Sequence, residues 1–140
     1  MIYEFAKPKD LEAVAALLNT CKLPANDLEA HEFIVAVDEN MIVGCIGMEL
    51  EGPLLRSLAV DPANRKQGIA GELCARLLRH AGDQDVKNLY LLTDSADKFF
   101  ERIGFQRINR EDAPESVRTH KQFTELCPSS AIVMRKEIGR

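Results

Sequence analysis

The segment of residues 54–78, LLRSLAVDPANRKQGIAGELCARLL, most constrains what this chain can fold into. It has the pattern of a buried strand, a short loop and a helix whose first turn is rich in glycine. Within it, RKQGIA at residues 65–70 fits the pattern R/Q-x-x-G-x-G/A. Glycine at position 68 lets the backbone approach a ligand closely, and backbone amides at a helix start attract anions. Such a loop typically binds a pyrophosphate group, and a cation at position 65 or 66 would help to hold it.

Strand and helix patterns alternate along the rest of the chain. A strand at 2–6 and a helix that starts at 7–10 are expected first. Three strands joined by short turns and then a strand-helix-strand pattern follow, so we predict a mixed α/β sheet with helices on both faces. Gly82 is the expected C-cap of the helix after the glycine loop, and Gly104 is expected to end a short helix over 95–102. A further helix is expected over 113–121, with Pro114 in its first turn. The expected strands are 2–6, 33–37, 41–48, 54–60, 88–93, 105–108 and 131–136.

Size and composition fit one globular domain over residues 1–140, with 46% hydrophobic and 29% charged residues. A net charge of −4 argues mildly against a nucleic-acid partner or an anionic membrane. No stretch resembles a signal peptide or a membrane span, so a cytoplasmic protein is expected. Cysteines at 21, 45, 74 and 127 form no C-x-x-C pair. Neither a metal site nor a disulfide framework is expected from them, and Cys45 and Cys74 are interpreted as small buried hydrophobes.

A second motif lies downstream of the glycine loop. Residues 95–105, SADKFFERIGF, follow an expected strand and end in a glycine-phenylalanine pair. Together with RKQGIA, this motif resembles the GNAT superfamily of acetyl-CoA-dependent acetyltransferases, and the resemblance is densest over residues 54–110. It implies a mostly antiparallel sheet of six or seven strands. The strands at 54–60 and 88–93 would splay apart around acetyl-CoA, and the amine would arrive from the opposite side.

The resemblance also implies where the cofactor would bind. Backbone groups of Leu58, Ala59 and Val60 would pair with the pantetheine arm as an added strand does. The pyrophosphate would lie on the loop and first helical turn formed by Arg65, Lys66, Gln67, Gly68, Ile69, Ala70 and Gly71. The alternative for the loop taken alone is an ordinary glycine-containing helix start.

The chain departs from the family where a tyrosine often protonates the leaving thiolate. The matching residue is Phe100, which has no acidic proton, and Thr93 stands where relatives often carry an asparagine that touches the pantetheine. Either another acid acts, or the thiolate leaves unassisted, which a thiol pKa of about 8.5 tolerates.

The general base is also open. Glu49 and Glu51 could accept the amine proton through water, or they could be solvated carboxylates at a strand end. His31 and His120 are further candidates, because a histidine pKa lies near neutrality. Direct attack in a ternary complex is the favoured mechanism, and a covalent intermediate on Cys127 or Ser129 is a minor option.

Arg56 is a lone cation inside the apolar strand LLRSLAV. Strict alternation would place it on the same face as Leu54 and Leu58. It could bind a substrate carboxylate, close an internal salt bridge or face solvent.

The carboxy-terminal stretch over residues 113–136 resembles a short branch of the family, the N-acetylglutamate-synthase-like and arsenic-resistance-associated (arsinothricin-type) enzymes. This resemblance implies a small, acidic amino acid or an analogue as acceptor, and it makes arsenic resistance one possible role. Arg118 and Gln122 lie four apart on an expected helix and could line the pocket, or they could form an ordinary exposed face. The alternatives are acetylation of a peptide or protein amine, and a non-catalytic acyl-CoA sensor. A homodimer is expected by analogy only.

Overall fold

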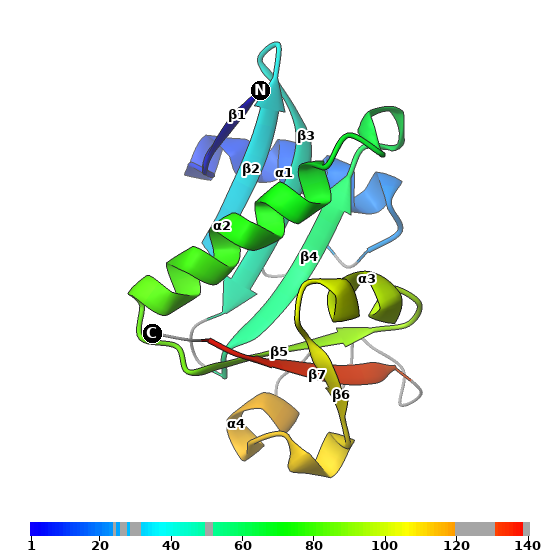
Figure 1. Cartoon of the computed structure of the whole chain (residues 1–140). Helices are drawn as coiled ribbons and strands as arrows, with labels where there is room; N and C mark the ends of the chain where they lie inside the picture. The colour runs from blue at the N-terminus through cyan, green and yellow to red at the C-terminus, as the bar shows by residue number, and fades with distance from the viewer. Residues whose placement is uncertain (24, 26–27, 29–31, 50–51, 120–130, 139–140) are drawn as a thin grey trace. The chain divides into compact units, whose positions relative to one another are not determined.

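The computed structural model describes residues 1–23, 25, 28, 32–49, 52–119 and 131–138. The strands are β1 (Ile2–Phe5), β2 (Glu32–Asp38), β3 (Met41–Glu49), β4 (Leu54–Val60), β5 (Asn88–Thr93), β6 (Gln106–Ile108) and β7 (Ile132–Glu137). The helices are α1 (Leu11–Thr20), α2 (Ile69–Asp83), α3 (Asp97–Arg102) and α4 (Glu115–Arg118). Their succession along the chain is drawn in Figure 1. The predicted mixed α/β architecture is confirmed.

The strands pair in the order β1-β2-β3-β4-β5-β7-β6. Neighbours are antiparallel at β1/β2, β2/β3, β5/β7 and β6/β7, whereas β4 and β5 are parallel and pair at Leu54 and Tyr90. The expectation of a mostly antiparallel sheet with six or seven strands is therefore confirmed. The predicted separation of β4 from β5 beyond this pair stays a prediction. The structure divides into two compact units, one of Met1–Glu49 with Arg56–His80 and one of Leu50–Leu55 with Ala81–Arg140.

In the first unit, the β2–β3 hairpin carries a helix on each face. Glu39 and Asn40 have φ of 50° and 67°, the left-handed pair that a tight two-residue hairpin turn requires. Val14, Leu17 and Leu18 of α1 pack in one cluster with Phe33, Val35, Cys45 and Ala59. Gly44, the neighbour of Cys45, faces the other way, because a Cβ on it would lie 3.0 Å from Ile69 of α2.

In the second unit, β6 and β7 also carry a helix on each face. Ile108 packs against a cluster formed by Leu54, Tyr90, Ala113, Val117 and Val133, which brings α4 onto that face. The preceding residue, Arg107, points to the opposite face and forms an ion pair with Asp97 of α3. Alternation along a three-residue strand thus determines which helix covers which face.

Two helix ends test the capping predictions. Gly104 adopts φ of 105°, and Phe105 N–H donates to Phe100 O at 3.0 Å, so Gly104 ends α3 as predicted. The prediction for Gly82 is wrong, because Gly82 lies inside α2. There Asp85 takes the left-handed conformation, with φ of 62°, and Val86 N–H donates to Ala81 O at 3.0 Å. An aspartate can adopt this conformation at modest cost, so the helix runs past its glycine.

Helix α4 is shorter at its start than predicted. It covers Glu115–Arg118, and Pro114 is its N-cap residue in extended conformation and not a residue of its first turn. The predicted end of this helix, at 120–121, lies outside the described residues. Val117 is fully buried and holds the helix on its cluster.

The Asp97–Arg107 ion pair predicts a pH dependence of stability. The hydrogen bond from Arg107, more than any other cause, lowers the pKa of Asp97. A carboxyl with a depressed pKa in the folded state stabilises the fold above its unfolded pKa of about 3.9, and this contribution is lost as the pH falls through the folded value. In urea denaturation, the stability advantage of the wild type over Asp97→Asn should therefore be full at neutral pH and should shrink in acid. The matched exposed control Glu111→Gln should show a smaller dependence, and an advantage that grew in acid would contradict the assignment.

Candidate functional site

The loop that joins β4 to α2 is fixed by its own hydrogen bonds. Asp61 Oδ1 accepts from Ala63 N–H at 2.9 Å, and Asp61 O accepts from Asn64 N–H at 2.8 Å. These bonds form the short 3-10 turn Pro62–Asn64. The chain then passes through Lys66 and Gly68, with φ of 67° and 80°. Two left-handed residues so close together bend the loop sharply into the start of α2, and glycine is the residue that adopts this conformation without cost.

The start of α2 is open. The N–H groups of Ile69, Ala70 and Gly71 precede the first bond of the helix, from Glu72 N–H to Gly68 O at 3.1 Å. A Cβ added to Gly68 or to Gly71 would meet no atom within 4 Å. Unpaired N–H groups beside open space form the kind of backbone cradle that receives an anion. The Ile69 side chain is 3% exposed, so it anchors this turn while the backbone amides stay accessible.

Arg65 does not reach toward this cradle. Its Nε donates to Val60 O at 3.1 Å, and its Nη2 lies 3.6 Å from Cys21 Sγ. The Cys21 thiol is also 3.6 Å from Val60 O. The guanidinium of Arg65 and the carbonyl of Val60, both predicted to serve the cofactor, therefore bind each other here. The exposed Lys66 is left as the cation of the loop nearest to the open backbone.

Strand β4 is distorted at Ser57, which has φ of 60°. Its carbonyl accepts from Cys45 Sγ at 3.3 Å, which ties the distorted residue to β3. The strict alternation that placed Arg56 and Leu58 on one face does not continue through a left-handed residue, so that argument from the sequence fails at this point. Sequence reasoning also missed Ser57, because no glycine or asparagine marks the position.

Arg56 is 4% exposed, so the solvent-facing alternative is excluded. Its Nε donates to Ser57 Oγ at 2.9 Å, and the residue takes part in a further interaction. A buried guanidinium needs such partners, because an uncompensated charge costs several kcal/mol. The distortion at Ser57 thus places a hydroxyl where it fixes one edge of the guanidinium.

The candidate bases are only partly described. Glu49 is half-buried at the end of β3, its Oε2 is shielded from solvent, and the residue takes part in an interaction. It is therefore not a freely solvated strand-end carboxylate. The other candidates, Glu51, His31, His120, Cys127 and Ser129, lie outside the described residues, as does Gln122.

Three predicted site residues belong to the second unit. Phe100 is 5% exposed, and its ring makes edge-to-face contacts with Phe99 and Phe105 at 5.2 and 5.6 Å, so it serves the core of this unit. Thr93 Oγ1 accepts from Ala96 N–H at 2.9 Å and shapes the turn between β5 and α3. Arg118 is exposed, and its Nε donates to Ala113 O at 2.9 Å. Cofactor or acceptor roles for these three stay predictions.

Two thiols of the first unit, those of Cys45 and Cys74, are buried as the sequence indicated. Burial raises the pKa of Cys45 and of Cys74 to about 12. Both side chains therefore remain neutral at physiological pH, and they serve the core as small hydrophobes.

Comparison with known proteins places this arrangement in a family. The model of the acetyltransferase (GNAT) domain matches residues 29–107, which is more than half of the chain. The chain therefore belongs to the GNAT acetyltransferase family, and its members use acetyl-CoA.

Two curated relatives and two solved structures show similarity. The chain is 31% identical over 90 residues to an amino-acid acetyltransferase of Pseudomonas fluorescens, covering 61% of this chain and 21% of the relative. It is 33% identical over 105 residues to an amino-acid acetyltransferase of Mycobacterium tuberculosis, covering 71% and 57%. The N-acetylglutamate synthase of Neisseria gonorrhoeae, solved with coenzyme A and N-acetyl-glutamate, superposes with a TM-score of 0.85 at 21% identity, covering 100% of this chain and 36% of that one. A Mycobacterium tuberculosis protein solved with CoA gives 0.79 at 22% identity, covering 99% and 100%.

The chain thus spans about a fifth of the length of the Pseudomonas fluorescens relative and just over half of the length of the Mycobacterium tuberculosis relative. Among the described residues, no helix is long and apolar enough to cross a membrane. Within the same residues, no cluster of three or more histidine, cysteine, aspartate or glutamate side chains is placed to hold a metal ion.

The two glycines of the cradle predict opposite effects on stability. Gly68→Ala should destabilise the protein by roughly 1–2 kcal/mol, because an L-residue is strained at positive φ. Gly71→Ala should be neutral or stabilising by up to about 1 kcal/mol, because alanine favours a helix and its methyl group meets open space. Urea denaturation of the two variants measures both. Equal effects of the two substitutions would contradict the conformations described for this loop.

Proposed function

We propose that this chain binds acetyl-CoA, with the pyrophosphate on Lys66–Gly71, and transfers the acetyl group to the amino group of a small, acidic amino acid or an analogue. The observation that supports cofactor binding is the open backbone at Gly68 and Gly71, where a side chain would occupy the space that a pyrophosphate needs. Family membership supports acetyl transfer as the reaction. The chain spans only part of its curated relatives, so the activity is proposed for this chain on its own residues.

The proposed reaction is direct attack in a ternary complex. The amine nitrogen forms a bond to the acetyl carbon, the carbon–sulfur bond breaks, and the amine proton passes to a base. Glu49 is the described candidate for that base, acting through water, and Glu51 is the other. Phe100 supplies no proton, so the thiolate leaves without help from this position and takes its proton from solvent.

An amino acid is proposed as acceptor because Arg56 is a buried cation of fixed orientation. Guanidinium groups bind carboxylates through two parallel hydrogen bonds, and the bond from Arg56 Nε to Ser57 Oγ at 2.9 Å restricts the plane of the fork. Two relatives named amino-acid acetyltransferase support the same class of acceptor. We further propose that the acceptor carries an acidic side chain or is an arsenic-containing analogue of such an amino acid.

One alternative has an observation in its favour. A non-catalytic acyl-CoA sensor would need no proton donor, and Phe100 offers none. Steady release of free CoA in the presence of an amine panel, read with a thiol reagent, separates three functions. Turnover with amino acids supports the enzyme, turnover only with peptide amines supports a peptide acetyltransferase, and binding without turnover supports the sensor.

The cradle predicts how CoA affinity responds to substitution. Isothermal titration should show binding of CoA to the wild type, and Gly71→Ala should weaken it, because the added methyl group occupies the open space while the fold is kept. Gly68→Trp should abolish binding. The exposed Lys87→Ala, outside the cradle, is the matched control and should leave the affinity unchanged. Unchanged affinity in both glycine variants would place CoA elsewhere.

The proposed role of Arg56 predicts a selective loss of acceptor binding. Arg56→Ala should raise KM for the amino acid and lower kcat/KM on the order of 10- to 200-fold, because a charge-assisted contact contributes roughly 1.5–3 kcal/mol. Arg56→Lys should recover only part, since an ammonium group lacks the planar fork. Ser57→Ala should have a smaller effect in the same direction, because it releases only one edge of the guanidinium.

Stability separates this role from a purely structural one. If Arg56 only closes an internal ion pair, Arg56→Ala should lose about 3–5 kcal/mol of unfolding free energy. CoA affinity should stay near the wild-type value if the proposal holds. Normal melting together with wild-type efficiency would remove Arg56 from the site.

A further inference from the structure

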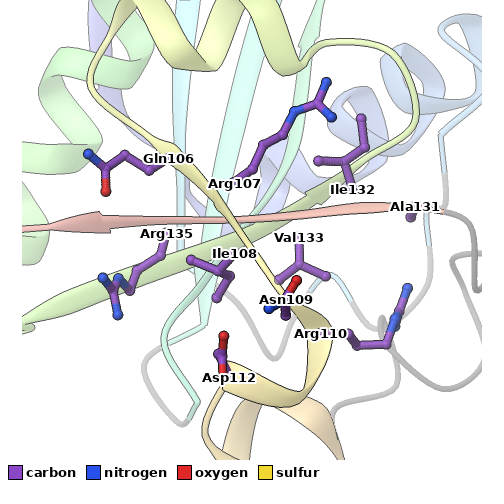
Figure 2. A pocket seen from close by; sticks show the side chains of 10 residues that line it. All are labelled: Gln106, Arg107, Ile108, Asn109, Arg110, Asp112, Ala131, Ile132, Val133 and Arg135. Carbon is purple, nitrogen blue, oxygen red and sulfur yellow. The ribbon is translucent and has the colours of Figure 1, made fainter.

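A hollow of about 640 Å³ lies on the face of the second unit formed by β6, β7 and the 3-10 turn Arg110–Asp112. Figure 2 shows the side chains that line it. We call it the β6–β7 hollow. Its volume lies within the range of about 300–1,000 Å³ that is usual for small-molecule sites.

The strand register builds its floor. Gln106 pairs with Arg135 and Ile108 pairs with Val133, so these four side chains lie on one face of β6 and β7. Ile108 is half-buried and gives this face its accessible apolar surface, whereas Val133 is 3% exposed and packs in the cluster with Val117 of α4. The Arg135 side chain lies on the same face. Arg107 points to the opposite face and pairs with Asp97 there, so its charge does not serve the hollow.

Arg135 is the side chain of the hollow whose charge has no partner among the described residues. It is half-buried, and among the described residues its side chain makes no hydrogen bond or ion pair. The chain as a whole is acidic, with a net charge of −4, so an anion here would be drawn by local geometry and not by a general positive surface. A half-buried guanidinium favours a planar carboxylate that it can grip with two hydrogen bonds.

Asp112 narrows the class of ligand. Its carboxylate lines the same hollow, and Figure 2 shows Arg135 to the left of Ile108 and Asp112 below it. The negative charge of Asp112 would repel a phosphate or another polyanion bound at Arg135. It favours a ligand that carries a positive group as well as a carboxylate. Arg110 also lines the hollow, and it takes part in an interaction.

We propose that the β6–β7 hollow binds a free aliphatic α-amino acid. Its carboxylate pairs with Arg135, its ammonium group faces Asp112, and its side chain lies on Ile108. The proposal rests on the second unit alone and does not depend on acetyl transfer.

The test uses the full chain, with L-leucine as the probe, followed through the methyl NMR signals of Ile108 and Val133. Leucine should shift these signals. 4-Methylpentanoate, which lacks the amine, and 3-methylbutylamine, which lacks the carboxylate, should each bind roughly tenfold more weakly or worse, because each loses a charge-assisted contact. Inorganic phosphate should compete poorly.

The variants test the named contacts. Arg135→Gln and Asp112→Asn should each weaken leucine binding roughly tenfold, and Arg135→Lys should recover only part of it. The exposed Arg79→Gln on α2 is the matched control for loss of one arginine and should bind as the wild type does. Arg56→Ala should also leave these shifts intact, which separates the hollow from the proposed acceptor site.

Three results would overturn the proposal. One is the absence of shifts at Ile108 and Val133 at millimolar leucine. Another is an affinity that Arg135→Gln leaves unchanged. The third is phosphate binding as tightly as leucine, which would make the hollow a general anion site.

Discussion

The close packing of α2 on β3 is the constraint on which the candidate cofactor site depends. Gly44 has no side chain, and a Cβ there would come within 3.0 Å of Ile69 and 3.1 Å of Leu73. Ile69 is therefore held at the sheet, and the next residues present their backbone and not their side chains to the open space at Gly68 and Gly71. A rigid helix start with its N–H groups turned outward follows from the size of one residue on a neighbouring strand.

The second constraint is the burial of charge. Arg56 and Asp97 are the buried charged residues among those the structure describes, and each is bound to a neighbour. Asp97 is bound to Arg107 of β6, which fastens α3 to the sheet. Arg56 is bound to Ser57, whose left-handed backbone distorts β4. Buried charges are retained at such positions when hydrogen bonds compensate for lost hydration, and both of these also orient the segments that carry them.

The spacing of apolar residues predicted most of the helices and strands. Each such element buries one face in the core, and this requires apolar residues at regular intervals. Helix ends were less predictable. Gly104 ended its helix as expected, but Gly82 did not, since Asp85 could adopt the left-handed turn and α2 had a surface to cover for its full length. The glycine loop was recognised for the same reason as Gly104: a conformation that only glycine adopts easily leaves a mark in the sequence.

The sequence by itself determined the α/β class, the positions of the strands, the glycine loop before α2 and membership in a family that its motifs already resembled. The tertiary structure decided where charged side chains go. Arg65 turns back to Val60, Arg107 crosses to Asp97, and Arg135 remains beside the β6–β7 hollow, although Arg107 and Arg135 both lie in strands and Arg65 lies in the loop after one. A long flexible side chain is directed by the partners that folding brings near it, and those partners are distant in the sequence.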